Sequence, residues 1–228
     1  MKNVDIMCDT SSLVTLTGSC LDGILYFLHD HFNVRFIIPP TVEDEGVKRP
    51  ISMGLKQYAF SALKITHAMN RRIVITVDAE TKQLTQKILF LTNNLFFIKG
   101  KPLRLVHAGE AEMIALGNIL NLHTLLIDER TTRMLIESPF KIKEHLEQEF
   151  KVNIMVHRDN LFEFSNLTKG MEIIRSSELV ILAYENGYFD QYDTLKVNIL
   201  EAALHKVKFS GCAIRFDEIK TFIDGLRV

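Results

Sequence analysis

The sequence predicts an α/β fold built on a mainly parallel sheet, and two patterns predict it. Short apolar runs rich in Val and Ile, bounded by polar or turn residues, have the length and composition of strands buried on both faces. Segments with apolar residues at helical spacing lie between these runs. Strands that alternate with helices of about 10–15 residues form βαβ units, so most of the sheet is expected to be parallel.

Five apolar runs have the character of such strands. They lack the strict alternation of a half-exposed strand, which favours a position inside the sheet. In chain order the runs are Val4–Cys8, Val34–Ile38, Ile73–Val77, Thr124–Ile127 and Val152–Val156.

Helical stripes occupy the segments between these strands. Apolar residues recur at helical spacing in residues 21–28, 55–63 and 114–120, and again in 84–95, where Asn93 and Asn94 should end the helix. After Val156 the pattern changes to helices alone, expected at 176–188, 194–208 and 217–226. Ser176 or Ser177 and Asp217 are the expected N-caps of the first and last of them. The chain is therefore predicted to have a main domain over 1–157 and a C-terminal helical extension over 158–228.

The composition is that of a globular protein with a large core. The chain has 228 residues, 47% of them hydrophobic, without a cationic and apolar leader or a run of about 18 apolar residues. No secretory signal, transmembrane helix or membrane partner is therefore expected. The three cysteines, Cys8, Cys20 and Cys212, form no CxxC pair. Reduced thiols and a cytoplasmic location follow as expectations.

Charge is distributed unevenly along the chain. Residues 1–45 carry seven acidic side chains and two basic ones, whereas residues 46–107 carry eleven basic side chains and two acidic ones. A polyanion such as RNA would be attracted to the basic block, with the Arg71–Arg72 pair the first choice because arginine binds phosphate in a bidentate manner. The alternative is that these side chains only solvate helix faces. The candidate RNA-binding residues are Lys48, Arg49, Arg71, Arg72, Lys99, Lys101 and Arg104.

Acidic residues follow several of the predicted strands. Asp9 comes directly after the first strand and is followed by the hydroxyls of Thr10 and Ser11, and Asp128 follows the strand Thr124–Ile127. Parallel strands would bring Asp9 and Asp128 to the same edge of the sheet, where open α/β sheets bind ligands. Carboxylates clustered there need a cation to offset their repulsion, and Mg²⁺ and Mn²⁺ prefer oxygen ligands. The pattern therefore predicts a divalent-metal site.

Three glutamates add to this set. Glu45 lies about one turn after the second strand, and Glu110 and Glu112 lie near the start of a helix. Glu110 and Glu112 are about 200° apart on that helix, so we expect Glu110 to be the ligand and Glu112 to line the rim or face solvent. Each glutamate could instead be a first-turn acid that complements the helix dipole, and Asp128 could be a simple helix cap.

Taken in order, these motifs resemble the PIN-domain nucleases, in particular the prokaryotic branch with a GEAE motif that includes toxin-like ribonucleases. The resemblance covers roughly residues 1–157. The matching stretches are Asp9-Thr10-Ser11, Pro39-x-x-Val42-x-x-Glu45, Gly109-Glu110-Ala111-Glu112-x-Ile114-Ala115-Leu116 and Leu126-Ile127-Asp128-Glu129-Arg130.

The resemblance implies a five-stranded parallel sheet with helices on both faces and a carboxylate cluster that holds Mg²⁺ or Mn²⁺. Asp9 would be the first ligand, supported by Ser11. Glu45 and Glu110 would be the second and third acids. Either member of the Asp128–Glu129 pair would reach the metal, and Arg130 or Arg133 would contact a phosphate. The resemblance also suggests a homodimer and a cognate inhibitor protein as partners to look for.

The predicted function is therefore that of a metal-dependent endoribonuclease, with Asp9, Glu45, Glu110 and Asp128 as its catalytic residues. One alternative is a non-catalytic RNA-binding or ribosome-associated protein on the same fold, and another is a scaffold whose C-terminal extension binds a protein partner. Other chemistries lack their motifs. Ser11 stands where a dehalogenase-type phosphatase needs its second Asp, and neither a GxxxxGK[ST] loop nor a GxGxxG turn occurs.

Overall fold

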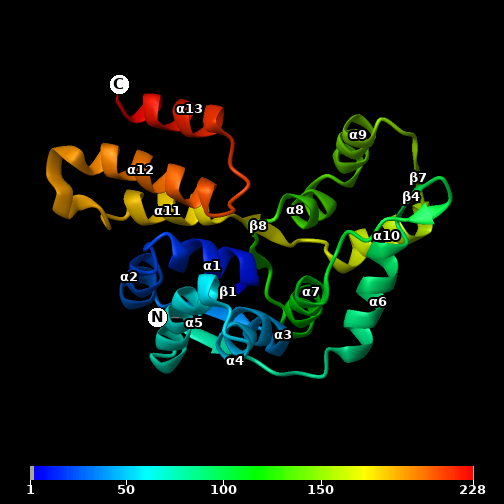
Figure 1. Ribbon diagram of the computed structural model, residues 1–228, viewed down its shortest axis with the longest axis horizontal. Coiled ribbons are helices and arrows are strands. Elements are labelled where there is room, and N and C mark those ends of the chain that lie inside the picture. The colour runs from blue at the N-terminus through cyan, green and yellow to red at the C-terminus, as the bar shows by residue number, and fades with distance from the viewer. Residues whose placement is uncertain (1–2, 228) are drawn as a thin grey trace.

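A five-stranded parallel sheet forms the centre of the protein, in the strand order β3-β2-β1-β6-β8 (Figure 1). The computed structural model describes residues 3–227. Each neighbouring pair in this sheet is parallel. The predicted α/β class with a five-stranded parallel sheet is thus confirmed. The strands are β1 (Val4–Cys8), β2 (Val34–Ile38), β3 (Val74–Thr76), β6 (Thr124–Leu126) and β8 (Glu172–Ile174).

One predicted strand belongs to a different sheet. The run Val152–Val156 contains β7 (Ile154–Val156), which pairs antiparallel with β4 (Phe96–Ile98). Together with β5 (Lys101–Pro102) these strands form a separate three-stranded sheet in the order β5-β4-β7. The fifth strand of the main sheet is β8 instead, which pairs with β6 through Thr124 opposite Glu172. Glu172 within β8 and Arg175 after it leave only Ile173 and Ile174 as an apolar run, which is too short to be recognised.

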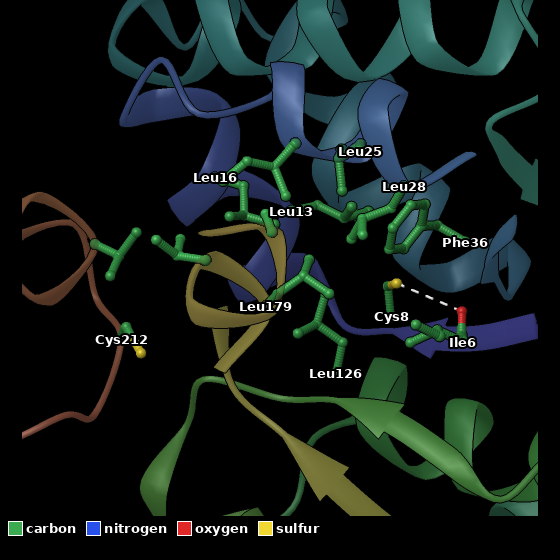
Figure 2. Close-up of a cluster of buried hydrophobic side chains, with 14 of the residues drawn as sticks. Ile6, Cys8, Leu13, Leu16, Leu25, Leu28, Phe36, Leu126, Leu179 and Cys212 are labelled. Carbon is green, nitrogen blue, oxygen red and sulfur yellow. Dashed lines mark hydrogen bonds between the residues drawn. The ribbon is translucent and has the colours of Figure 1, made fainter. Parts of the chain in front are cut away.

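Side chains of the main sheet alternate between two hydrophobic cores, as the pleat requires. In β1, Ile6 and Cys8 enter the first core, while Met7 enters the second. Figure 2 shows the first core, where Ile6, Cys8, Phe36 and Leu126 meet side chains of the covering helices. The helices on this face are α1 (Thr10–Gly18), α2 (Gly23–Phe32), α5 (Lys56–Asn70), α11 (Ser176–Glu185), α12 (Lys196–Phe209) and α13 (Phe216–Leu226).

The second core lies on the opposite face of the sheet. Ile37 and Leu125 point into it, beside Phe96 of β4 and Phe164 near the C-terminal end of the helix that follows β7. The small sheet is thus attached to this side of the molecule (Figure 1). The helices that contribute to the second core are α6 (Lys82–Asn93), α7 (Ala108–Leu120), α8 (Arg130–Glu137), α9 (Pro139–Phe150) and α10 (Arg158–Leu167). Asn93 ends α6, as predicted.

A continuous helical segment follows β2. It begins as α3 (Pro40–Glu43), with Pro40 at its first turn, widens into the π-helical turn η1 (Asp44–Lys48) and ends as α4 (Arg49–Ser52). Proline is well suited to a first helical turn because its missing N–H would have no partner there. The segment places Glu45 within the π-helical turn, at the strand-end edge of the sheet.

The C-terminal segment is not a purely helical extension, contrary to the prediction for 158–228. It supplies β8, and its helices pack in the first core with β1 and β2 through residues such as Leu179, Leu204 and Ile223. The predicted helices are present, joined by the 3₁₀ segment η2 (Asp190–Leu195). Their N-caps are Arg175 and Arg215 instead of the predicted Ser176 or Ser177 and Asp217. In both cases a Glu at the third helical position accepts a hydrogen bond from the cap N–H.

In the part of the chain that the structure describes, no single helix is long and apolar enough to cross a membrane. The helices α1 and α2 pass that test only as a pair, and the pair is bent by 108°. All three cysteines are free thiols, with Cys8 and Cys212 buried and Cys20 exposed.

Candidate functional site

Asp9 lies at the end of β1 and caps α1. Its Oδ1 accepts a hydrogen bond of 2.8 Å from the Ser12 N–H, and its Oδ2 accepts one of 2.5 Å from the Ser11 hydroxyl. Ser11 therefore donates to this carboxylate, the contact that the family resemblance implies. Only 4% of Asp9 is exposed. Burial raises the pKa of Asp9 to about 7, a shift that the hydrogen bonds from Ser11 and Ser12 oppose and the charge of Asp128 increases.

Glu45 reaches the same region from the π-helical turn η1. Its Oε2 accepts a hydrogen bond of 3.3 Å from the Thr10 hydroxyl, so Thr10 ties Glu45 to the start of α1. The first turn of α7 also approaches Glu45 closely. A Cβ at Gly109 would lie 3.1 Å from Oε2 of Glu45, which is tight for such a contact. Glycine at position 109 thus gives the Glu45 carboxylate its space, a role that the GEAE pattern alone did not reveal.

Glu110 is held in place by two hydrogen bonds. Its Oε2 accepts one of 2.8 Å from the His107 N–H, which completes a capping box at the start of α7, and its Oε1 accepts one of 2.7 Å from the Thr132 hydroxyl. Burial is the main cause of a raised pKa at Glu110, and the neighbouring charge of Glu129 adds to it. Glu110 is therefore both a first-turn acid and a member of a carboxylate cluster.

Glu129 caps α8. Its Oε2 accepts a hydrogen bond of 2.6 Å from the Thr132 N–H. Since the hydroxyl of the same Thr132 binds Glu110, this threonine links the two carboxylates. The sequence did not indicate Thr132, because it stands three residues after the acidic pair and outside every motif.

These carboxylates share one cavity of about 250 Å³, which we call the carboxylate pocket. Four acidic side chains from four separate elements line it, and none of its lining residues, all within the described range 3–227, is Lys or Arg. The full lining is Asp9, Thr10, Ser11, Val42, Glu45, His107, Gly109, Glu110 and Glu129.

Asp128, predicted to be a catalytic ligand, does not line the pocket. It is fully buried, and its two oxygens accept hydrogen bonds of 2.7 and 2.8 Å from the backbone N–H and the hydroxyl of Ser176. Leu126 faces the first core and Ile127 the second, so continued alternation turns Asp128 toward the first core and leaves Glu129 for the pocket. Alternation in the sequence puts the two acids on opposite faces of the sheet, but it does not say which face holds the pocket.

Glu112 neither lines the pocket nor faces solvent, contrary to the prediction. It is half-buried, and its oxygens accept hydrogen bonds from the Thr41 N–H at 3.0 Å and the Thr81 hydroxyl at 3.3 Å. It therefore fastens α7 to the start of α3 and to the segment before α6. The predicted angular separation of Glu110 and Glu112 accounts for their different surroundings.

The predicted RNA-binding residues are dispersed. Arg71 and Arg72 precede β3 at the end of the sheet where the strands begin, opposite the carboxylate pocket, which lies beyond the strand ends. Lys48 and Arg49 form ion pairs with Glu43 and Asp44 of their own segment, at 2.9 and 2.6 Å. Lys99 and Lys101 lie at the turn between β4 and β5 of the small sheet.

Arg104 is the predicted RNA-binding residue that borders the pocket. It lines a second cavity, of about 360 Å³, which shares His107, Glu110 and Glu129 with the carboxylate pocket. Another cavity, of about 650 Å³, lies between α9, β7 and α10. Its lining includes Phe140, Phe162 and Arg158 but no carboxylate, so it is not the place for metal chemistry.

The pocket matches a hard divalent cation in charge and in donor type. Carboxylate and hydroxyl oxygens are the ligands that Mg²⁺ and Mn²⁺ prefer, and the raised pKa values of Asp9 and Glu110 reflect groups that a cation would favour in ionised form. Over residues 3–227, however, no group of three or more His, Cys, Asp or Glu side chains is arranged to hold a metal ion. Mg²⁺ commonly binds through one or two carboxylates and keeps several waters, and the pocket fits that mode.

No family model, curated protein or solved structure matches this chain.

Proposed function

We propose that this protein is a metal-dependent nuclease that hydrolyses RNA phosphodiester bonds. The observation that carries the proposal is the carboxylate pocket, in which Asp9, Glu45, Glu110 and Glu129 converge from separate elements without a Lys or Arg among the described lining residues. A pocket of this kind attracts divalent cations. A phosphodiester, which is itself anionic, could approach the pocket only if a bound cation reduced the negative charge of the carboxylates.

The fold supports the proposal. The strand order β3-β2-β1-β6-β8 puts β1 at the centre of the parallel sheet, and Asp9 follows its last residue. Ligands of open parallel sheets bind beyond the carboxyl ends of the strands. This arrangement is compatible with the PIN-like fold that the sequence resembles.

The roles of the individual residues follow from their contacts. Asp9, Glu45, Glu110 and Glu129 would hold Mg²⁺ or Mn²⁺, directly or through its waters. The hydroxyls of Ser11, Thr10 and Thr132 keep three of these carboxylates oriented through the hydrogen bonds described above. A bound divalent ion would supply the usual metal chemistry, lowering the pKa of water and stabilising the leaving oxygen. Asp128 is absent from this set because Ser176 occupies both of its oxygens.

The proposal is tested by incubating the purified protein with fluorescently labelled RNA and with DNA of the same sequence, in Mn²⁺, in Mg²⁺ and in a chelator. Wild type is expected to cleave RNA only with metal, and Asp9→Asn is expected to lose that activity. Glu112→Gln is the matched control, because Glu112 is a half-buried carboxylate outside the pocket. Intact RNA in all metal conditions, or equal cleavage by wild type and Asp9→Asn, would overturn the proposal.

A non-catalytic RNA-binding protein on the same fold is the second candidate. It is favoured by the absence, over the described residues, of a side-chain group arranged for a metal ion. This candidate predicts RNA binding that is unaffected by Asp9→Asn and no cleavage under any metal condition, so the same experiment separates the two.

A further inference from the structure

A further cavity near the carboxylate pocket is lined mainly by basic side chains. It has a volume of about 430 Å³ and is bounded by α8, the start of α9, the end of α12 and the segment before α13. We call it the basic cavity. Its lining has five basic side chains, Arg130, Arg133, Lys141, Lys208 and Arg215, and two acidic ones, Glu137 and Glu218.

The acidic side chains do not neutralise this cavity. Glu218 is shared between Arg215, at 3.1 Å, and Arg175, at 3.0 Å. The carboxylate of Glu137 lies 3.8 Å from Arg133. Within residues 3–227, Arg130 and Lys141 take part in no ion pair, and both are exposed. Arg215 also pairs with Asp217 at 3.0 Å, so the positive charge that remains available to an anion is mainly that of Arg130 and Lys141.

Arg133 has a donor without a partner. Its Nε atom is buried and donates no hydrogen bond within the described part of the chain. The distance of 3.8 Å to Glu137 is too long for a hydrogen bond. A buried donor left unpaired is costly, and a guanidinium donor is particularly suited to phosphate oxygens. The other guanidinium nitrogens of Arg133, which lines the cavity, are donors of the kind that bind phosphate.

The basic cavity adjoins the carboxylate pocket through α8. Glu129 lines the pocket, the next residue, Arg130, lines the cavity, and Arg133 lies about 4.5 Å further along the helix axis. Figure 1 shows α8 next to the connection between α12 and α13. A hydrogen bond of 3.2 Å from the Ala213 N–H to the Asp128 carbonyl fixes that connection beside the end of β6.

We propose that the basic cavity binds the backbone phosphates of a single-stranded RNA whose reacting phosphodiester lies at the carboxylate pocket. The identity of the polymer rests on the proposed function, whereas the phosphate chemistry rests on the cavity itself. Lys208 and Arg215 make the C-terminal segment one wall of the RNA path. Since phosphate contacts carry no sequence information, the cavity contributes affinity and not sequence preference.

The test measures RNA binding in a chelator, so that it does not depend on cleavage. Affinity of a fluorescent single-stranded RNA is measured by anisotropy over a series of salt concentrations for wild type and for Arg130→Gln/Lys141→Gln. These two side chains are exposed, so their replacement should leave the fold intact. Each lost phosphate contact should flatten the slope of log K against log salt by about 0.7, hence by about 1.4 for the double variant. Arg215→Gln should flatten it by about 0.7, which tests the C-terminal wall.

Lys56→Gln/Lys169→Gln is the charge-matched control, because both lysines are exposed and line neither cavity. Its slope should equal that of wild type. Absent RNA binding, or equal slopes for the cavity and control variants, would overturn the proposal. Binding of inorganic phosphate measured by calorimetry, without any RNA binding, would also overturn it and would assign a small anion to the cavity. If the cavity variants flatten the slope as predicted but wild type cleaves no RNA, the RNA path is retained and only the nuclease is rejected.

Discussion

Asp128 and Ser176 are joined by two hydrogen bonds, from the Ser176 N–H to Oδ1 at 2.7 Å and from its hydroxyl to Oδ2 at 2.8 Å. The pair connects the end of β6 to the first turn of α11 across 48 residues of sequence. Both residues are completely buried. The contact therefore attaches the C-terminal helices to the sheet and withdraws one conspicuous acid from the candidate site.

Asp128→Asn should destabilise the protein without a specific loss of metal response. An Asn amide would offer its N–H₂ where Ser176 also offers a donor, so the variant should lose about 1–3 kcal/mol of unfolding free energy. Urea unfolding at neutral pH measures this, with Ser176→Ala expected to lose a smaller amount, about 1 kcal/mol. Full stability together with loss of Mn²⁺ binding in Asp128→Asn would restore Asp128 as a ligand.

The contribution of Asp9 to the stability of the wild type should fall as pH rises from about 4 to 7. Asp9 has a folded pKa of about 7 and an ordinary value of 3.8, so in that window the folded state keeps a proton that the unfolded state has released. Raising the pH then favours unfolding until Asp9 is ionised in both states. Asp9→Asn has no proton to lose at this position. Its unfolding free energy should therefore rise relative to that of wild type, by a few kcal/mol between pH 4 and pH 8. Denaturant unfolding from pH 4 to 8 measures it, and a constant difference would contradict it.

Mn²⁺ should stabilise the wild type more at pH 8 than at pH 5.5. Metal binding requires ionised carboxylates, and at the lower pH the cation must displace the proton that the folded state keeps on Asp9. The shift in Tm at a fixed Mn²⁺ concentration measures the effect, and Asp9→Asn should show little shift at either pH. A shift in the wild type that does not depend on pH would mean that Asp9 is not a ligand.

Glu110→Gln should abolish metal-dependent cleavage, whereas Glu112→Gln should retain it. Glu110 lines the pocket, while Glu112 binds the Thr41 N–H and the Thr81 hydroxyl outside it. The Glu112 variant should instead lose about 1–2 kcal/mol of unfolding free energy, because a neutral amide accepts the Thr41 hydrogen bond less strongly. Cleavage assays and urea unfolding on both variants measure this. The reverse pattern would show that the pocket is not the reactive centre.

Gly109→Ala should impair the metal response more than stability. The added methyl would lie 3.1 Å from Oε2 of Glu45 and should displace that carboxylate, while alanine favours the helix by roughly 1 kcal/mol. Gly225→Ala is the matched control, because a Cβ there meets nothing within 4 Å. Mn²⁺ titration by calorimetry, with unfolding measured in parallel, compares the two. Equal Mn²⁺ affinity in Gly109→Ala and wild type would show that Glu45 does not participate.

The sequence by itself determined the features that depend on neighbouring residues. The apolar runs Val4–Cys8 and Val34–Ile38 coincide with β1 and β2, because burial on both faces leaves a local signature. Asp9 and Glu110 could be recognised as candidate site residues because Asp9 directly follows a strand and Glu110 lies in the first turn of a helix. Their supporting groups, Ser11 and the N–H of His107, lie within three residues of them.

Only the tertiary structure decided which distant groups meet. It assigned Asp128 to Ser176 and Glu129 to the carboxylate pocket, a choice that depends on which face of the sheet receives α11. It also placed Arg71 at the opposite end of the sheet from the pocket and Arg215 in the basic cavity. Charge composition cannot make these distinctions, because a charged side chain pairs with whichever element packs beside it. That packing is set by strand order and helix docking, which have no local signature in the sequence.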